Sequence, residues 1–241
     1  MRDFKQILTR LLLCTAALFC LQATAQTFCG EHKFDGEHKN EATGYIVGGR
    51  NVVTGVFGGM AASYKYHITD RWNVEGDMQA QFGKQLYGAF VKGGYRLPWK
   101  YFNFFFDAKM MYNRYNRFNT NEYTANISAT VEAPYFEVTI GESAMWYRML
   151  GDGYNEPLTL TFGFGLNVRP RWNSWNIGLF FRNFDEYYYE NWNINWGLRF
   201  NANLTKDMRL FGEFNIRPAG SLSQLASKYE FSQKIGLKYV W

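Results

Sequence analysis

The chain has 241 residues, of which 47% are hydrophobic and 20% aromatic, and its formal net charge is +5. This length fits one large domain or two small ones. Beyond the N-terminal segment, no stretch approaches the roughly 20 consecutive apolar residues of a membrane-spanning helix, which excludes a helical membrane protein. The small basic excess gives no argument for nucleic-acid binding, and no nucleic-acid partner is expected.

Residues 1 to 25 read as a cleaved signal peptide. Three basic residues fall within the first ten, an apolar run follows at 11 to 21, and Ala23 and Ala25 fit a small-residue cleavage site. The apolar run is too short to span a bilayer. Cleavage after Ala25 would leave Cys29 as the only cysteine, so no intrachain disulfide is expected.

Residues 26 to 42 lack strand character and form an N-terminal periplasmic segment or a plug for a lumen. They contain a short repeat, GEHK, that places His32 and His38 six positions apart. Two such histidines can bind a metal, but this spacing is nonspecific and makes them weak candidates. We expect a solvated segment there, with no metal and no cofactor.

Residues 43 to 241 alternate between apolar and polar side chains, the pattern of strands with one apolar face. The alternation predicts about twelve strands, with ten or fourteen as other possible counts. They are expected near 43–49, 52–68, 72–82, 86–97, 102–117, 123–132, a seventh around Gly141 and Glu142, 158–169, 175–181, 192–204, 208–217 and 228–241. Glu142 breaks the alternation, so we predict a β-bulge that turns its carboxylate to the polar face.

The last strand alternates almost perfectly and ends on Trp241. With the alternation of short turns and longer loops before it, this resembles bacterial outer-membrane β-barrel proteins. A soluble β-sandwich also alternates, but its strands are shorter than these apolar faces. The resemblance implies an all-β, transmembrane, antiparallel up-and-down β-barrel in the outer membrane, with both termini in the periplasm. It also implies contact with outer-membrane lipid and recognition of the last strand by the barrel assembly machinery.

Aromatic side chains gather at both ends of the expected strands, where amphipathic rings suit the headgroup level of a bilayer. The membrane-interface candidates are Trp72, Trp99, Trp175, Trp192 and Trp241. The aromatic-rich strands and the Ala-Gln at the signal cleavage site are also similar to outer-membrane proteins of Bacteroidota.

Charged residues on the polar faces are partly sorted along the chain, although several charges of the opposite sign sit within each group. The lumen-lining acidic candidates are Glu75, Asp77, Asp107, Glu132, Glu137 and Glu142, and the basic candidates are Arg169, Arg182, Arg199, Arg209, Arg217, Lys234 and Lys238. Two walls of opposite charge across water would give a selective pore. The alternative is that the same charges pair and close the lumen.

Two functions follow from these patterns. The first is a small porin-like channel for the passive passage of small polar solutes. The second is a closed structural or binding barrel that acts through its outer loops, with the Tyr-rich loop 185–192 as contact surface, or as a partner in an envelope complex. Some outer-membrane barrels are phospholipases with a Ser-His pair, but no serine pattern accompanies His67, so we expect no enzyme and no catalytic residue.

Overall fold

A computed structural model of the chain describes residues 40–51, 55–83, 86–100, 102–116, 119–133, 135–148, 153–168, 175–185, 187–189, 194–218 and 229–241. All of them belong to one compact unit, Glu37–Trp241. The expected signal peptide, His32, His38, Arg169 and Trp192 lie outside the described residues. Within the described ranges, no helix is long and apolar enough to cross a membrane.

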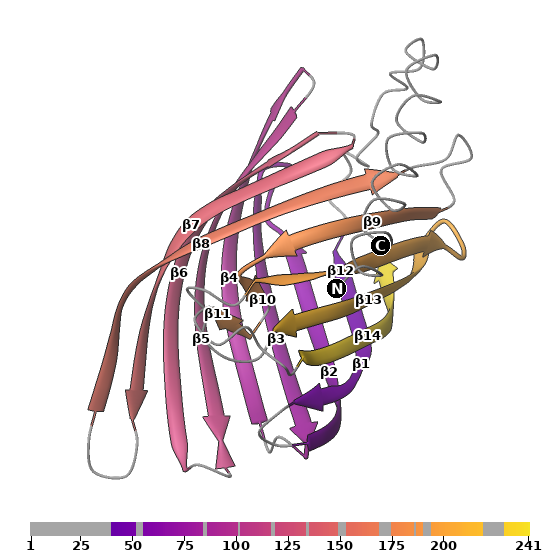
Figure 1. Cartoon of the computed structure of the whole chain (residues 1–241). Coiled ribbons are helices and arrows are strands. Elements are labelled where there is room, and N and C mark those ends of the chain that lie inside the picture. Colours follow the sequence, from indigo (N-terminus) through magenta and orange to yellow (C-terminus); the bar gives the residue numbers. More distant parts are fainter. Residues whose placement is uncertain are drawn as a thin grey trace, which may run out of the picture. The chain divides into compact units, whose positions relative to one another are not determined.

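Twelve antiparallel strands close into a barrel, as the sequence predicts (Figure 1). Each strand pairs with its neighbours along the chain, and β1 pairs with β14 to close the ring. A separate pair, β10 and β11, belongs to the connection between β9 and β12. The strands are β1 (Glu41–Asn51), β2 (Gly55–His67), β3 (Trp72–Phe82), β4 (Leu86–Trp99), β5 (Phe102–Tyr115), β6 (Thr120–Glu132), β7 (Phe136–Arg148), β8 (Gly153–Val168), β9 (Trp175–Arg182), β10 (Phe184–Asp185), β11 (Tyr188–Tyr189), β12 (Asn195–Asn203), β13 (Met208–Pro218) and β14 (Tyr229–Val240).

The barrel is apolar outside and polar inside, because each strand turns alternate side chains to opposite faces. On β3, for example, Met78 is 69% exposed while its neighbours Asp77 and Gln79 are 5% and 6% exposed. The same alternation leaves a band of large apolar side chains exposed around the outer surface of every barrel strand with described side chains. A barrel that is apolar outside and polar within is the arrangement of a membrane barrel.

The closing strands β1 and β14 form a continuous ladder from Glu41 opposite Val240 to Arg50 opposite Phe231. Beyond the ladder, Asn40 and Trp241 exchange backbone hydrogen bonds of 2.9 and 3.1 Å. The sequence made β1 the weakest strand, at 43–49, but it runs from Glu41 to Asn51. Pairing on both edges explains the difference, since two complete ladders extend a strand beyond its apolar pattern.

The outward position of Glu142 corrects the prediction of an inward carboxylate at this point of β7. Glu142 is exposed and pairs with Ile127, which lies on the apolar outer face, whereas the next residue, Ser143, is buried inside. A register shift does occur between Ser143 and Met145, where β7 meets β8. It comes after Glu142 along the chain, so it does not turn this side chain inward.

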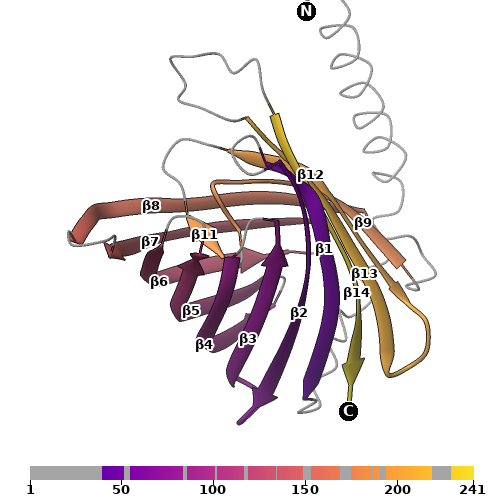
Figure 2. The same ribbon diagram turned by 90° about the horizontal axis from the view of Figure 1, so that it is seen from below.

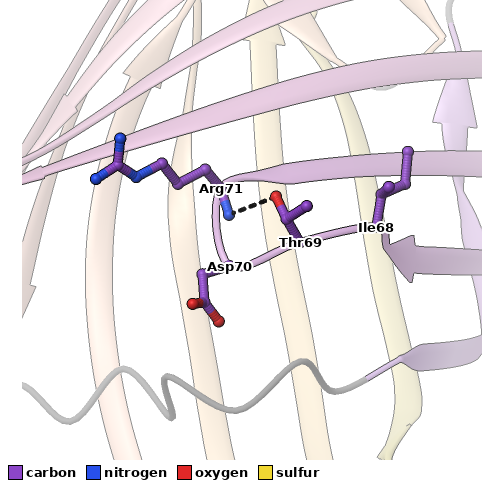
Figure 3. Close-up of a pocket in the computed structure, with 4 residues that line it drawn as sticks. All are labelled: Ile68, Thr69, Asp70 and Arg71. Carbon is purple, nitrogen blue, oxygen red and sulfur yellow. Dashed lines mark hydrogen bonds between the residues drawn. The ribbon is translucent and has the colours of Figure 1, made fainter.

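The turn between β2 and β3, residues 68 to 71, shows how the short connections are held. Thr69 Oγ1 accepts a hydrogen bond from the backbone N–H of Arg71 at 3.2 Å (Figure 3). It also accepts one from the backbone N–H of Trp72 at 3.0 Å. A threonine hydroxyl that bonds its own turn is a common way to satisfy turn backbone. The four residues line a small pocket that belongs to this turn. The turn lies at the end of the barrel that carries Asn40, whose side chain accepts a bond from the His67 N–H.

Candidate functional site: the barrel interior

The inner face carries the described charged residues that the sequence singled out, except Glu142; Arg169 lies outside the described residues. Where their side chains are described, they are half-buried or buried. The acidic ones are Glu75, Asp77, Asp107, Glu132 and Glu137, and the basic ones are Arg182, Arg199, Arg209, Arg217, Lys234 and Lys238. The same face also carries four further bases and four further acids: Lys65, Lys92, Arg96 and Lys109, and Glu41, Glu122, Glu213 and Glu230. The inner face is therefore nearly balanced in charge.

One ion pair joins the acidic and basic sides of the barrel. Arg199 on β12 donates to Glu137 on β7 at 2.7 Å, although β8 and β9 separate these two strands in the ring. Gly165 on β8 leaves the room for it, because a Cβ atom there would lie 2.8 Å from Glu137 Cγ and 2.9 Å from Arg199 Nη2. The pair therefore spans two strands along the inner wall.

Further pairs join charges of opposite sign on nearby strands. Arg182 bonds Glu213 across β12 at 2.5 Å, and Lys92 bonds Glu75 at 2.7 Å on the neighbouring strand. Two more inner pairs are Arg217 with Glu230 and Lys238 with Glu41. Buried or half-buried charges are tolerated when they are paired in this way. The pairing reduces the transverse field that two charged walls would produce.

The connection between β9 and β12 folds into the barrel. Asn183 follows β9, and β10 and β11 then form a short hairpin in which Phe184 pairs with Tyr189 and Asp185 with Tyr188. Figure 2 shows β11 within the ring of strands. Asn183 fixes the base of this hairpin to β8: its side chain donates to the Leu160 carbonyl at 2.6 Å and accepts from the Phe162 N–H at 2.8 Å. The buried amide thus continues the β8 ladder beyond the end of β9.

Tyr187, at the tip of the hairpin, docks on the opposite wall and is only 5% exposed. Its hydroxyl donates to Asp77 on β3, and its backbone carbonyl accepts from Asn113 Nδ2 on β5 at 2.8 Å. Its ring packs with Phe90, Met111 and Met145, with the ring centroid 5.5 Å from that of Phe90. Because β3 stands halfway round the ring from β9, the hairpin crosses the lumen.

This inward position corrects one prediction. The Tyr-rich loop 185–192 is expected from the sequence to form an external contact surface, but Tyr187 lies inside the barrel. The sequence contained one signal of this inward fold: on the inner face of β4, the small residue Gly88 lies between Leu86 and Phe90. A Cβ atom at Gly88 would lie 2.6 Å from Tyr187 Cε1, so this glycine makes room for the ring.

The described interface candidates lie exposed near strand ends: Trp72 begins β3, Trp99 ends β4, Trp175 begins β9 and Trp241 follows β14. Trp72 packs against Tyr95, with ring centroids 4.7 Å apart, and Trp241 packs against Tyr64 at 5.9 Å. Their place at the headgroup level of a bilayer remains a prediction. Among the described residues, no group of three or more His, Cys, Asp or Glu side chains could hold a metal ion.

Comparison with known proteins places the fold. No protein-family model matches the chain, and no curated protein matches it in sequence. Among solved structures, the KdgM porin aligns with a TM-score of 0.57 and 8% identity over 83% of this chain and 99% of that one. The KdgM porin in complex with disordered oligogalacturonate aligns with a TM-score of 0.55 and 8% identity over 84% of this chain and 99% of that one. The Acinetobacter baumannii outer membrane protein Omp33 aligns with a TM-score of 0.52 and 14% identity over 85% of this chain and 99% of that one. At these identities the likeness shows a shared fold, the twelve-stranded barrel.

Proposed function

We propose that this protein is a small outer-membrane channel for the passive passage of small polar solutes. The observation that carries the proposal is a closed barrel with an apolar outer face and with many charged and polar side chains on its inner face. Polar groups along a pore replace the hydration of a passing solute. A barrel that served only as a membrane anchor would not need twelve strands, because the interior of an eight-stranded barrel is already filled by side chains.

The balance of inner charges favours neutral or zwitterionic solutes over strongly charged ones. Several cations of this face lie within ion-pair distance of carboxylates, as in the Arg199–Glu137 and Arg182–Glu213 pairs. A polyanion would have to compete with these carboxylates for the same guanidinium groups. The likeness to the KdgM porin in complex with oligogalacturonate therefore supports a porin-like fold for this chain more than a shared substrate.

The same proposal includes the cellular setting. The signal peptide would direct export, both termini would face the periplasm, and the assembly machinery would read the last strand, which ends on Trp241. The exposed apolar band would contact outer-membrane lipid. A source among the Bacteroidota is part of this proposal and rests on the sequence resemblance alone. Passage through such a channel would involve no catalysis.

Planar-bilayer recording of the purified, refolded protein tests this function. We expect stepwise currents in symmetric salt, with little preference between small anions and cations because the inner charges are nearly balanced. Heat-modifiable migration on gels would first establish that the barrel is folded. A folded protein that inserts into the bilayer and stays silent over many insertions would contradict the channel.

A second candidate, a closed barrel that binds a partner in the envelope, is favoured by one observation. The hairpin that ends in Tyr187 crosses the lumen and the inner charges are paired, which is what a sealed interior requires. Copurification of a stable partner with a non-conducting barrel would support this function. Recovery of the bare protein, with conductance, would exclude it.

A further inference from the structure

We propose that Tyr187 sets the width of the channel and thereby the largest solute that passes. This inference rests on the channel function proposed above and adds the residue that determines its size selectivity. The hairpin of β10, Tyr187 and β11 starts from the β9–β12 side and reaches the wall formed by β3, β4 and β5. It therefore divides the cross-section of the barrel at its own level.

The tip is held by two kinds of contact. The polar contacts are the Tyr187 hydroxyl with Asp77 and the Tyr187 carbonyl with Asn113, which also donates to Glu122 at 2.9 Å. The apolar contact is the packing of the ring on Phe90, Met111 and Met145. Removing the whole side chain would abolish both the packing and the bond to Asp77, whereas removing the hydroxyl alone would abolish only that bond.

The base of the hairpin is fixed separately from the tip. Asn183 is bonded to β8, and Asn195 on β12 donates to the Phe184 carbonyl at 3.5 Å. Gly163 on β8 lies beside the Phe184 ring: a Cβ atom at Gly163 would be 3.1 Å from Phe184 Cε1. Substitution at the tip therefore leaves the base and the barrel ladders in place. The change that we expect is confined to the space between Tyr187 and the β3–β5 wall.

The first experiment compares Tyr187→Ala and Tyr187→Phe with the wild type and with Tyr87→Ala. Tyr87 stands beside Gly88 on β4 but faces outward and is exposed, so it is a matched control. The readouts are the single-channel conductance and the largest neutral sugar that swells protein-containing liposomes. Tyr187→Ala should raise both, and Tyr87→Ala should change neither.

Tyr187→Phe should have an intermediate effect, because the ring keeps its packing. We expect a low-conductance level with Tyr187 docked on the wall and a high-conductance level with Tyr187 undocked. Loss of the hydrogen bond to the buried carboxylate should raise the ratio of time spent in the high level to time spent in the low level about tenfold, equivalent to about 1.4 kcal/mol. A wild type that conducts and a Tyr187→Ala variant with the same conductance and sugar limit would overturn the inference while leaving the channel function intact. A silent wild type with a conducting Tyr187→Ala variant would overturn the channel function of the wild-type protein, but would support the position of Tyr187 across the lumen. Silence of every folded variant would overturn the channel function itself.

A second experiment tests the docked position directly. In a Cys29→Ser background, the pair Gly88→Cys and Tyr187→Cys should form a disulfide on mild oxidation. The Tyr187 side chain starts beside Gly88, with Cδ1 2.5 Å from the Cβ position of Gly88, and the bond from Asn113 to the carbonyl of residue 187 is kept in this variant. The control pair, Tyr87→Cys with Tyr187→Cys, should not, since Tyr87 points away from the lumen. We expect the oxidised protein to pass less current than the reduced one. Failure of the first pair to cross-link in the folded protein would overturn the docked tip.

Discussion

Exchange of Arg199 for glutamate tests whether the Arg199–Glu137 ion pair lies beside the path of permeating ions. The substitution removes one positive charge and adds one negative charge at a wall position whose side chain is half-buried. The net charge of the inner face, which is nearly balanced in the wild type, then becomes more negative by two units. We expect the channel to favour cations.

The size of the effect follows from Coulomb's law. Two unit charges at about 8 Å from a permeating ion in water change its free energy by about 1 kcal/mol, and screening at 0.1 M salt reduces this to about 0.5 kcal/mol. The added negative charge stabilises a permeating cation and destabilises a permeating anion by this amount. The permeability ratio of K⁺ to Cl⁻ should therefore rise about fivefold. At 0.01 M salt, weaker screening should raise the change to about tenfold or more.

The reversal potential across a KCl gradient measures this ratio. Two controls separate the position from the charge. The double exchange Glu137→Arg with Arg199→Glu restores a pair of opposite charges and should return the ratio to that of the wild type. Lys206→Glu makes the same change of charge at an exposed turn, where the Lys206 side chain is 90% exposed, and should have a much smaller effect. An unchanged reversal potential in Arg199→Glu would show that this ion pair does not lie beside the path of permeating ions. The same conclusion would follow if the double exchange shifted the reversal potential as much as Arg199→Glu alone.

Two further substitutions test the outer face and the base of the hairpin. Glu142→Leu removes a carboxylate from the apolar outer band and should raise the free energy of unfolding in lipid vesicles by about 1 to 3 kcal/mol, measured by denaturant titration; no gain would show that Glu142 does not face lipid. Asn183→Ala leaves the Leu160 carbonyl and the Phe162 N–H without their side-chain partner and should cost about 1 to 3 kcal/mol in the same assay. An unchanged midpoint for Asn183→Ala would mean that the base of the hairpin is not held as described.

Much of the barrel could be predicted from the sequence because the alternation of side chains is a local property of each strand. On β3, the sequence alone separates Met78 from Asp77 and Gln79, and the structure turns them to opposite faces. Strand ends were less predictable. Pro98 was expected to end the fourth strand, yet β4 continues to Trp99, with Pro98 opposite Asn103. The neighbouring strand decides where backbone pairing stops, and the sequence of a single strand does not contain that information.

Two features of the interior depended on contacts between distant parts of the chain. The direction of Glu142 depends on where β7 shifts its register against β8, and that shift comes after Glu142. The inward fold of Tyr187 depends on Asp77, Asn113 and the space at Gly88, all from other strands. A tyrosine run between two strands is otherwise typical of an exposed loop. Apart from the glycine at position 88, these long-range contacts leave no local pattern in the sequence.

Permeability of liposomes to graded neutral solutes tests the central claim most directly, because it measures passage without an electric field. Liposomes that contain the wild-type protein are exposed to iso-osmotic solutions of small sugars of increasing size, and swelling is followed by light scattering. The account predicts rapid swelling with the smallest polar solutes and a cutoff that moves to larger sugars in Tyr187→Ala. Liposomes with folded wild-type protein and folded Tyr187→Ala protein that swell no faster than protein-free liposomes would contradict it.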